Sequence, residues 1–250
     1  MESSKTLLAE CKSRLQEGGV MHHPFLKRME AGQLRKERMP DFVAQWYKVS
    51  QSHRTAFRGM VGNPKIADEN ILCDLTRILM EEYGEGDRKK MHVRLLNRML
   101  TVSGLTVDDV AHVKPLPSIA AFSRTVSEVW REGEPATAFG LHFGLEYLAS
   151  AQQVYFSRGM KKYDFLSPYS RKYFNLHAEA ETRHVAVSER GFLSYANNPA
   201  DRIKLLQGIE QASVLLNNMW GEFDSFLFPA SQPSLRTAPL QRAEYKAPRR

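Results

Sequence analysis

A histidine–glutamate–histidine triplet stands in the stretch from Phe174 to His184. His177, Glu181 and His184 occupy positions i, i+4 and i+7. At about 100° per residue, these positions fall within roughly 60° of arc, so an α-helix presents all three side chains on one face. Buried ionisable groups need partners, and a divalent metal ion suits this mixture of nitrogen and oxygen ligands. The triplet therefore predicts a metal site, and the alternative is a surface helix with scattered His and Glu.

The residues around the triplet indicate which side of this helix is buried. The inward stripe continues through small or aromatic residues, namely Tyr173, Ala180, Ser188 and Gly191. The opposite side carries polar residues, namely Lys172, Asn175, Glu179, Arg183 and Arg190. Glu181 is therefore expected to point inward and Glu179 outward. Glu181 and His184 also have the i, i+3 spacing that di-iron carboxylate helix bundles use.

A second candidate ligand is Glu146. It lies in the middle of a helix that is expected to begin at Gly133-Glu134-Pro135 and to run to about residue 151. This helix is apolar on nearly every side, which is typical of a buried helix. An ionised carboxylate without a partner would cost several kcal/mol there. His142, one turn earlier, is either a further ligand or a hydrogen-bonded core histidine.

A third group of candidate ligands consists of Glu81 or Glu82 together with His92. A glycine-rich break between two predicted helices separates the glutamates from His92. Helical phase places Glu82 at the centre of the apolar stripe that precedes it. Together the three segments offer three histidines and three carboxylates, which is enough for two metal ions bridged by a carboxylate. Imidazole and carboxylate with open positions suit non-heme iron that activates dioxygen, and manganese or zinc remains open.

Helices separated by short breaks must position these groups, because helical spacing recurs along the chain and strand alternation is almost absent. Besides the segments already named, helices are expected at residues 2–16, 25–34, 40–49, 64–83, 92–99, 106–113, 119–130 and 200–226. The sequence therefore predicts an all-α fold. We expect one helical domain over residues 1–228, followed by a disordered basic tail over residues 229–250 that is rich in Pro, Ser, Arg and Gln.

Composition and charge argue against nucleic-acid binding and against a membrane-spanning protein. The 250 residues carry a formal net charge of +7, and the tail holds Arg236, Arg242, Lys246, Arg249 and Arg250 against Glu244. The rest of the chain lacks a stripe of Lys and Arg interleaved with aromatic residues, so no nucleic acid is expected. No apolar run approaches the ~20 residues of a membrane span. Two isolated cysteines and the absence of a signal segment indicate a cytoplasmic protein without a membrane partner.

The order of these motifs resembles one protein family. The pattern is Glu-Glu-x-Gly, then a His, then a Glu on a buried helix, then His-x3-Glu-x2-His. It is similar to the pattern of the heme-oxygenase-like di-iron oxidases and oxygenases, which are relatives of thiaminase II and of pyrroloquinoline-quinone biosynthesis protein C. The resemblance spans most of residues 20–228. His23-Pro24-Phe25 is similar to the family's entry motif, and residues 223–227 resemble the last helix of the chlamydial protein associating with death domains.

The resemblance implies a bundle of about seven helices that binds two Fe(II) ions and uses O2 as cosubstrate. It assigns the ligands to Glu81, His92, Glu146, His177, Glu181 and His184, with Glu81 preferred over Glu82. Many members have Asp where Glu181 stands, and the segment from Glu81 to His92 is longer than in the chlamydial protein. The implied function is oxidation of a small amine or amino-acid-type substrate, by N-oxygenation or oxidative C–C cleavage, in a biosynthetic pathway. A homodimer remains open.

Four other functions are compatible with parts of the pattern. A thiaminase-like hydrolase would need a nucleophilic cysteine near the ligands, and neither Cys11 nor Cys73 stands near them in the predicted helices. A cofactorless oxidase would not need the full ligand set, and heme could bind through His22 or His23. A non-catalytic interaction protein on the same fold is the fourth. Basic residues near the ligand helix could bind a substrate carboxylate or be solvated surface charges, namely Arg171, Lys172 and Arg183.

Overall fold

The computed structural model describes residues 2–229, apart from the side chains of Glu2, Ala180 and Glu181. Within that range the chain is built from α-helices and short 3-10 turns, without a strand. The predicted all-α fold is confirmed. Residues 230–250, which hold nearly all of the predicted basic tail, lie outside the described residues, so the predicted domain boundary stays a prediction.

Each predicted helix has a counterpart in the structure. The helix bounds are α1 Glu2–Glu17, η1 Val20–His22, α2 Pro24–Glu30, η2 Lys36–Arg38, α3 Met39–Val61, α4 Glu69–Glu82, η3 Gly84–Gly86, α5 His92–Val102, α6 Val107–His112, α7 Pro117–Glu132, α8 Pro135–Met160, α9 Lys172–Tyr195 and α10 Pro199–Leu227. Helices α3 and α8 extend well beyond their predicted ends at residues 49 and 151. The expected number of about seven helices is too low for the described range. Short helices such as α2 and α6 account for part of the difference, because they fill connections between the long helices.

Local sequence sets the ends of the helices that carry the candidate ligands. The Asp68 carboxylate accepts hydrogen bonds from the backbone N–H groups of Asn70 and Ile71 and so caps the start of α4. Pro135 stands in the first turn of α8, where its missing N–H costs nothing. These caps fix where α4 and α8 begin, and therefore how the glutamates further along each helix are directed.

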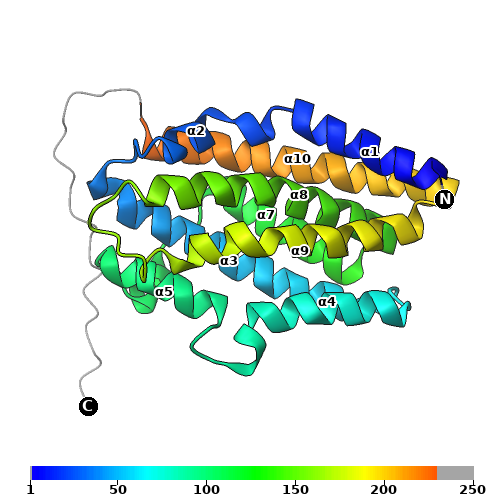
Figure 1. Cartoon of the computed structure of the whole chain (residues 1–250), viewed down its shortest axis with the longest axis horizontal. Coiled ribbons are helices and arrows are strands. Elements are labelled where there is room, and N and C mark those ends of the chain that lie inside the picture. The colour runs from blue at the N-terminus through cyan, green and yellow to red at the C-terminus, as the bar shows by residue number, and fades with distance from the viewer. Residues whose placement is uncertain (1, 230–250) are drawn as a thin grey trace, which may run out of the picture.

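Helix α8 lies at the centre of the bundle. It packs against α9 and α10 along most of its length and also against α2, while α3 packs against α7 (Figure 1). Its central residues are almost all buried, among them Leu141, Phe143 and Glu146. A Cβ on Gly140 would meet the carbonyl oxygen of Leu205, and one on Gly208 would meet the backbone of α8. The two glycines therefore let α8 and α10 approach closely.

Replacing Gly140 with Ala should lower the free energy of unfolding by ~2 kcal/mol or more, because the added methyl group meets backbone atoms that cannot move aside. Thermal unfolding of the metal-free protein measures this. Gly221→Ala is the matched control on α10, since no atom lies within 4 Å of the added Cβ. That change should instead stabilise the helix by roughly 0.5–1 kcal/mol. Equal effects of the two changes would show that close helix approach is not what Gly140 provides.

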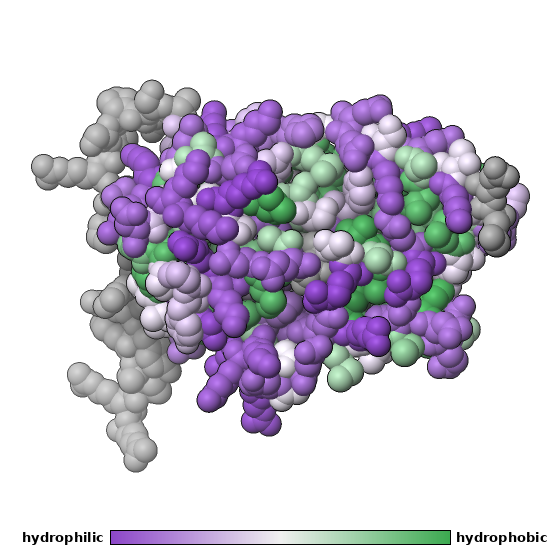
Figure 2. Space-filling view, in the orientation of Figure 1, coloured by the Kyte–Doolittle hydropathy of each residue, from purple (hydrophilic) through white to green (hydrophobic). Residues whose placement is uncertain are grey.

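Hydrophilic side chains cover most of the face seen in Figure 2, and hydrophobic residues reach it only in small areas. Scattered exposed apolar residues of this kind are normal for a folded domain. None of the helices in residues 2–229 has the length and apolar character needed to cross a membrane.

Candidate metal centre

The inward face of α9 carries the histidines of the triplet into the core. Tyr173, His177, His184 and Ser188 are all buried, whereas Lys172, Glu179, Arg183 and Arg190 are exposed on the other side. The predicted orientation of the helix is therefore confirmed for these residues. Glu181 lies on α9 between the two histidines, but its side chain is outside the described part of the structure.

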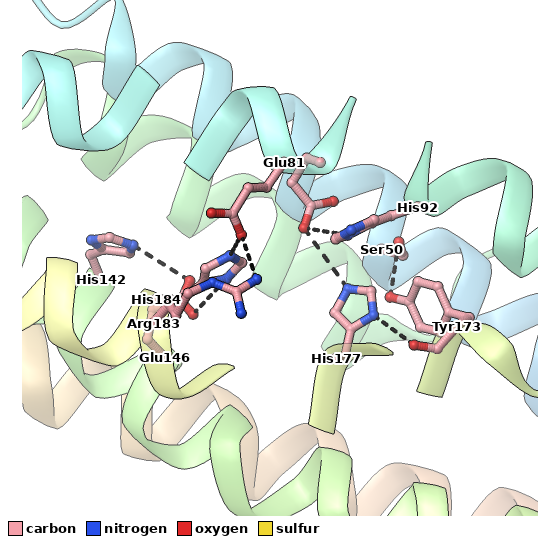
Figure 3. A network of polar contacts seen from close by, with 10 residues as sticks. Ser50, Glu81, His92, His142, Glu146, Tyr173, His177, Arg183 and His184 are labelled. Atoms are coloured by element: carbon pink, nitrogen blue, oxygen red, sulfur yellow. Dashed lines mark hydrogen bonds and ion pairs between the residues drawn. The ribbon is translucent and has the colours of Figure 1, made fainter. Parts of the chain in front are cut away.

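One group of candidate ligands, which we call the Glu82 cluster, comprises Glu82, His92 and His177. Nδ1 of His92 lies 2.7 Å from Oε1 of Glu82, and Nε2 of His177 lies 3.8 Å from the same oxygen. One ligand atom from each residue lies within 4.8 Å of the others. The three residues come from α4, α5 and α9, and Figure 3 shows His92 and His177 side by side. This donor set fits a divalent ion such as iron.

Hydrogen bonding fixes which nitrogen of His177 faces the cluster. Nδ1 of His177 lies 2.9 Å from the carbonyl oxygen of Tyr173, which can only accept, so Nδ1 carries the proton. Burial and the neighbouring His92 lower the pKa of His177 to about 4, which leaves the ring neutral at pH 7. Its Nε2 lone pair then faces a carboxylate oxygen. Two electron-pair donors directed at each other favour a cation between them.

The Glu82 carboxyl is ionised in the same cluster. Burial alone would raise its pKa, but the hydrogen bond to His92 and the charges of nearby histidines outweigh burial and lower the pKa to about 2. A carboxylate and a neutral imidazole are the protonation states that metal ligands require. Glu82 and His177 are therefore in the protonation states of metal ligands at neutral pH, and a bound ion would replace the hydrogen bond between His92 and Glu82.

A second group, the Glu81 cluster, comprises Glu81, Glu146 and His184. Nε2 of His184 lies 3.3 Å from Oε2 of Glu81, and its Nδ1 lies 3.6 Å from Oε2 of Glu146. The hydrogen bond from His184, opposed by burial and aided by Arg183, lowers the pKa of Glu81 to about 2. Figure 3 shows this group at the opposite end of the network from His92 and His177. The two carboxylates contact opposite nitrogens of His184, so these three residues supply metal-type donors without converging on one point as the Glu82 cluster does.

His142 lies beside the Glu81 cluster inside an aromatic enclosure. Its ring is fully buried and lies 5.4 Å from the ring of Phe57 and 5.7 Å from that of Trp130. Nε2 of His142 lies 3.4 Å from Oε1 of Glu146, and neither ring nitrogen has a hydrogen-bond partner among the described residues. The position of His142 suits a residue that orients Glu146. It does not match one of the two alternatives that the sequence left open for His142, a hydrogen-bonded core histidine.

Both glutamates at the end of α4 reach the centre, each in a different cluster. Consecutive residues on a helix point about 100° apart, so Glu81 meets His184 while Glu82 meets His92 and His177. The ligand set predicted from the family resemblance contains Glu81 and omits Glu82. Helical phase was the signal for Glu82, since it placed that residue on the apolar face of α4. The six-residue assignment itself stays a prediction.

A tight connection brings His92 back to α4. Gly84 and Gly86 adopt positive φ angles of 73° and 88°, which favour glycine. A Cβ on Gly84 would lie 2.7 Å from the backbone nitrogen of Met91, so only glycine lets the chain pass there. The connection therefore positions the first residue of α5 opposite the last turn of α4.

A cavity of about 80 Å³ touches both clusters. Residues of both line it, namely Glu82, Glu146, His177 and His184, and the rest of its lining includes Trp46, Ser50, His53, Gln152, Gln153 and Tyr173. Ser50 lies 3.3 Å from the Tyr173 hydroxyl. The lining contributed by the described residues contains no Lys or Arg. Sequence reasoning missed Ser50, His53 and the two glutamines, because their helices carry no pattern that distinguishes a cavity wall from core.

The basic residues near α9 lie away from this cavity. Arg183 is largely exposed and donates to Glu81, and Arg171 donates to the carbonyl oxygen of Leu166. Lys172 is exposed. Of the two readings that the sequence left open for these residues, surface charge fits their positions better than binding of a substrate carboxylate in the cavity.

Comparison with known proteins links this arrangement to iron. Residues 41–216 match the protein family described as iron-containing redox enzyme. A 4-aminobenzoate synthase of Chlamydia muridarum is 21% identical over 235 residues, which cover 92% of this chain and 94% of that protein.

Solved structures of low sequence identity share the fold. A CADD-like protein of unknown function from Nostoc punctiforme superposes with a TM-score of 0.69 at 14% identity, covering 91% of this chain and 99% of that one. A TenA homolog from Pseudomonas syringae pv. tomato gives 0.68 at 13% identity, covering 88% and 90%. A domain of unknown function with a heme oxygenase-like fold from Shewanella denitrificans gives 0.65 at 18% identity, covering 91% and 96%.

Proposed function

The chain belongs to the family of iron-containing redox enzymes, and from that premise we propose that it is a non-heme di-iron oxidase or oxygenase that uses O2. The observation that carries the proposal is the convergence of Glu82, His92 and His177 next to a cavity that Glu146 and His184 also line. The Glu82 cluster offers a donor set for one Fe(II) ion, and the Glu81 cluster supplies further donors for a second. Glu82, His92 and His177 would hold one ion, and Glu81, Glu146 and His184 the other. Glu181, between the histidines on α9, is proposed as a further ligand.

Bound ferrous ions would supply electrons to O2, and the protein residues would control access and orientation. His177 is held by the Tyr173 carbonyl group, so its Nε2 is directed at the cluster. His142 lies against the far oxygen of Glu146 and limits its rotation. The apolar part of the cavity wall, with Val49, Phe122 and Leu145, would limit the number of water molecules beside the reacting groups.

The proposed substrate is a small amine or amino-acid-type molecule, consumed by N-oxygenation or oxidative C–C cleavage. The cavity offers amide, hydroxyl and imidazole groups that can hydrogen-bond an amine, and its described lining holds no Lys or Arg that would pair with a carboxylate. The similarity to a 4-aminobenzoate synthase supports chemistry on a nitrogen-bearing compound.

Other functions on this fold have less support. A TenA-like hydrolytic reaction would need a thiol nucleophile, but Cys11 is buried outside the cavity lining and Cys73 is exposed. A cofactorless oxidase would give no role to three carboxylates that each face a histidine, namely Glu81, Glu82 and Glu146.

Anaerobic reconstitution with Fe(II), followed by mixing with O2 and a panel of small amines and amino acids, tests the proposal. We expect a transient visible absorption band and O2 consumption that requires both iron and a substrate. An iron-loaded protein that leaves O2 unconsumed with and without every compound, and that shows no absorption change, would contradict the proposed reaction.

A further inference from the structure

Helix α5 lies at the edge of the bundle (Figure 1). A second, larger hollow on the surface is lined in part by this helix. We call it the basic groove. Its volume is about 980 Å³, and its lining comes from the segment before α5, from α5 itself and from the loop between α8 and α9. Four of its residues are cationic, namely Arg88, Lys89, Arg94 and Arg98. Hydroxyl and amide groups complete the polar lining, and no carboxylate is among the residues that line it.

The four cations of the groove form no ion pair within residues 2–229, whereas some exposed cations elsewhere do. Arg190 pairs with Asp74 at 2.8 Å and Arg158 with Glu30 at 2.9 Å, and beside the groove Lys90 lies 3.8 Å from Asp87. Like charges gathered in one concave surface repel one another and raise the local concentration of anions. The groove therefore has an unbalanced positive charge that a ligand could neutralise.

Parts of the groove are already ordered for binding. Arg94 and Arg98 stand one turn apart on α5, so their side chains leave the same face of the helix. The guanidinium carbon of Arg98 lies 3.9 Å from the centroid of the Tyr169 ring, a cation–π contact that holds the head group in place. Ser167 accepts a hydrogen bond from the backbone N–H of Ser170, which fixes the facing loop.

We propose that the basic groove binds a small ligand that carries a diphosphate group. A planar guanidinium group binds two phosphate oxygens at once. Arg94 and Arg98 therefore suit a compact phosphate ligand better than a diffuse anionic surface. Four cations are enough to balance the roughly two to three negative charges of an esterified diphosphate, and the volume falls within the ~300–1,000 Å³ of small-molecule sites. None of the candidate metal ligands lines the groove, so the proposal is independent of the redox function.

Calorimetric titration of the full chain with inorganic pyrophosphate at low ionic strength tests the site. Arg94→Gln with Arg98→Gln removes two guanidinium groups, and binding should weaken by about 100-fold because charge-assisted hydrogen bonds are lost. Arg35→Gln with Arg124→Gln is the matched control, since both residues are exposed, lie outside the groove and change the net charge equally. The control should bind pyrophosphate as the wild type does, and all forms should bind the same amount of Fe(II), which checks that they are folded.

Three outcomes would overturn the proposal. The first is the absence of saturable pyrophosphate binding by the wild type, and the second is equal weakening in the groove and control variants. The third comes from parallel titrations with phosphatidylglycerol vesicles and with a single-stranded oligonucleotide. If only one of these binds in a groove-dependent way, and pyrophosphate neither binds nor competes, the groove recognises a membrane surface or a nucleic acid instead.

Discussion

Glu82→Gln is expected to weaken Fe(II) binding in the Glu82 cluster by at least about 100-fold. Glu82 supplies the only carboxylate of that cluster among the described residues, and its Oε1 is the atom that both His92 and His177 face. An amide has nearly the same shape but no charge to balance a cation. Removing one charged partner from a buried interaction typically costs about 3–5 kcal/mol, which corresponds to this factor. Titration of the anaerobic protein against a competing Fe(II) chelator measures the affinity.

The control for this change is Glu179→Gln, which alters a glutamate on the exposed side of α9. Its Fe(II) affinity should equal that of the wild type. If Glu82→Gln also retains wild-type affinity while Glu81→Gln loses it, the family resemblance alone would be the correct guide and Glu82 would not be a ligand.

Glu146→Gln is expected to remove most of the O2-dependent activity and yet to change the stability of the metal-free protein by no more than ~1 kcal/mol. The ion pairs of Glu146 within the described residues are with His142 and His184, at 3.4 and 3.6 Å. Although burial opposes it, the close contacts with these imidazoles hold the pKa of Glu146 well below its usual value. A glutamine side chain has nearly the same shape and can keep its carbonyl oxygen against the two imidazoles, and a neutral amide is cheaper to bury than a charge. Only the metal ion requires the negative charge.

Thermal unfolding of the metal-free wild type and variant at pH 7 separates this explanation from a purely structural one. If Glu146 mainly formed a buried ion pair with a protonated imidazole, the amide would strand that cation. The metal-free variant would then lose ~3 kcal/mol or more, and the role assigned to the metal would have to be abandoned.

Periodicity in the sequence predicted the helices and the inward face of α9, because each depends on residues close together in the chain. The apolar character of the helix around Glu146 also identified this residue as a buried carboxylate that needs a partner. What periodicity could not predict is which groups meet across helices. Glu81 and Glu82 are neighbours in sequence, but their separate partners depend on how α4 ends and on the turn at Gly84 that returns His92 to it.

The partner of Glu146 shows the same limit. His142 lies four residues before it on α8, a spacing that places both side chains on one face. The sequence left its role open, because a buried histidine looks the same whether it orients a carboxylate, binds a metal ion or fills the core. The aromatic rings around it come from α3, α7 and α8, and only their packing shows that Glu146 is the polar group it faces.

The iron stoichiometry of two single variants and their combination tests the two-cluster arrangement most directly. His177 and His184 are seven residues apart on α9, about 10 Å along the helix axis, and each belongs to a different cluster. After anaerobic loading with Fe(II) and removal of unbound metal, elemental analysis should find two ions per chain in the wild type. It should find one in His177→Ala, one in His184→Ala and none in the double variant. A single ion per wild-type chain, or two ions remaining in either single variant, would contradict a centre built from these two clusters.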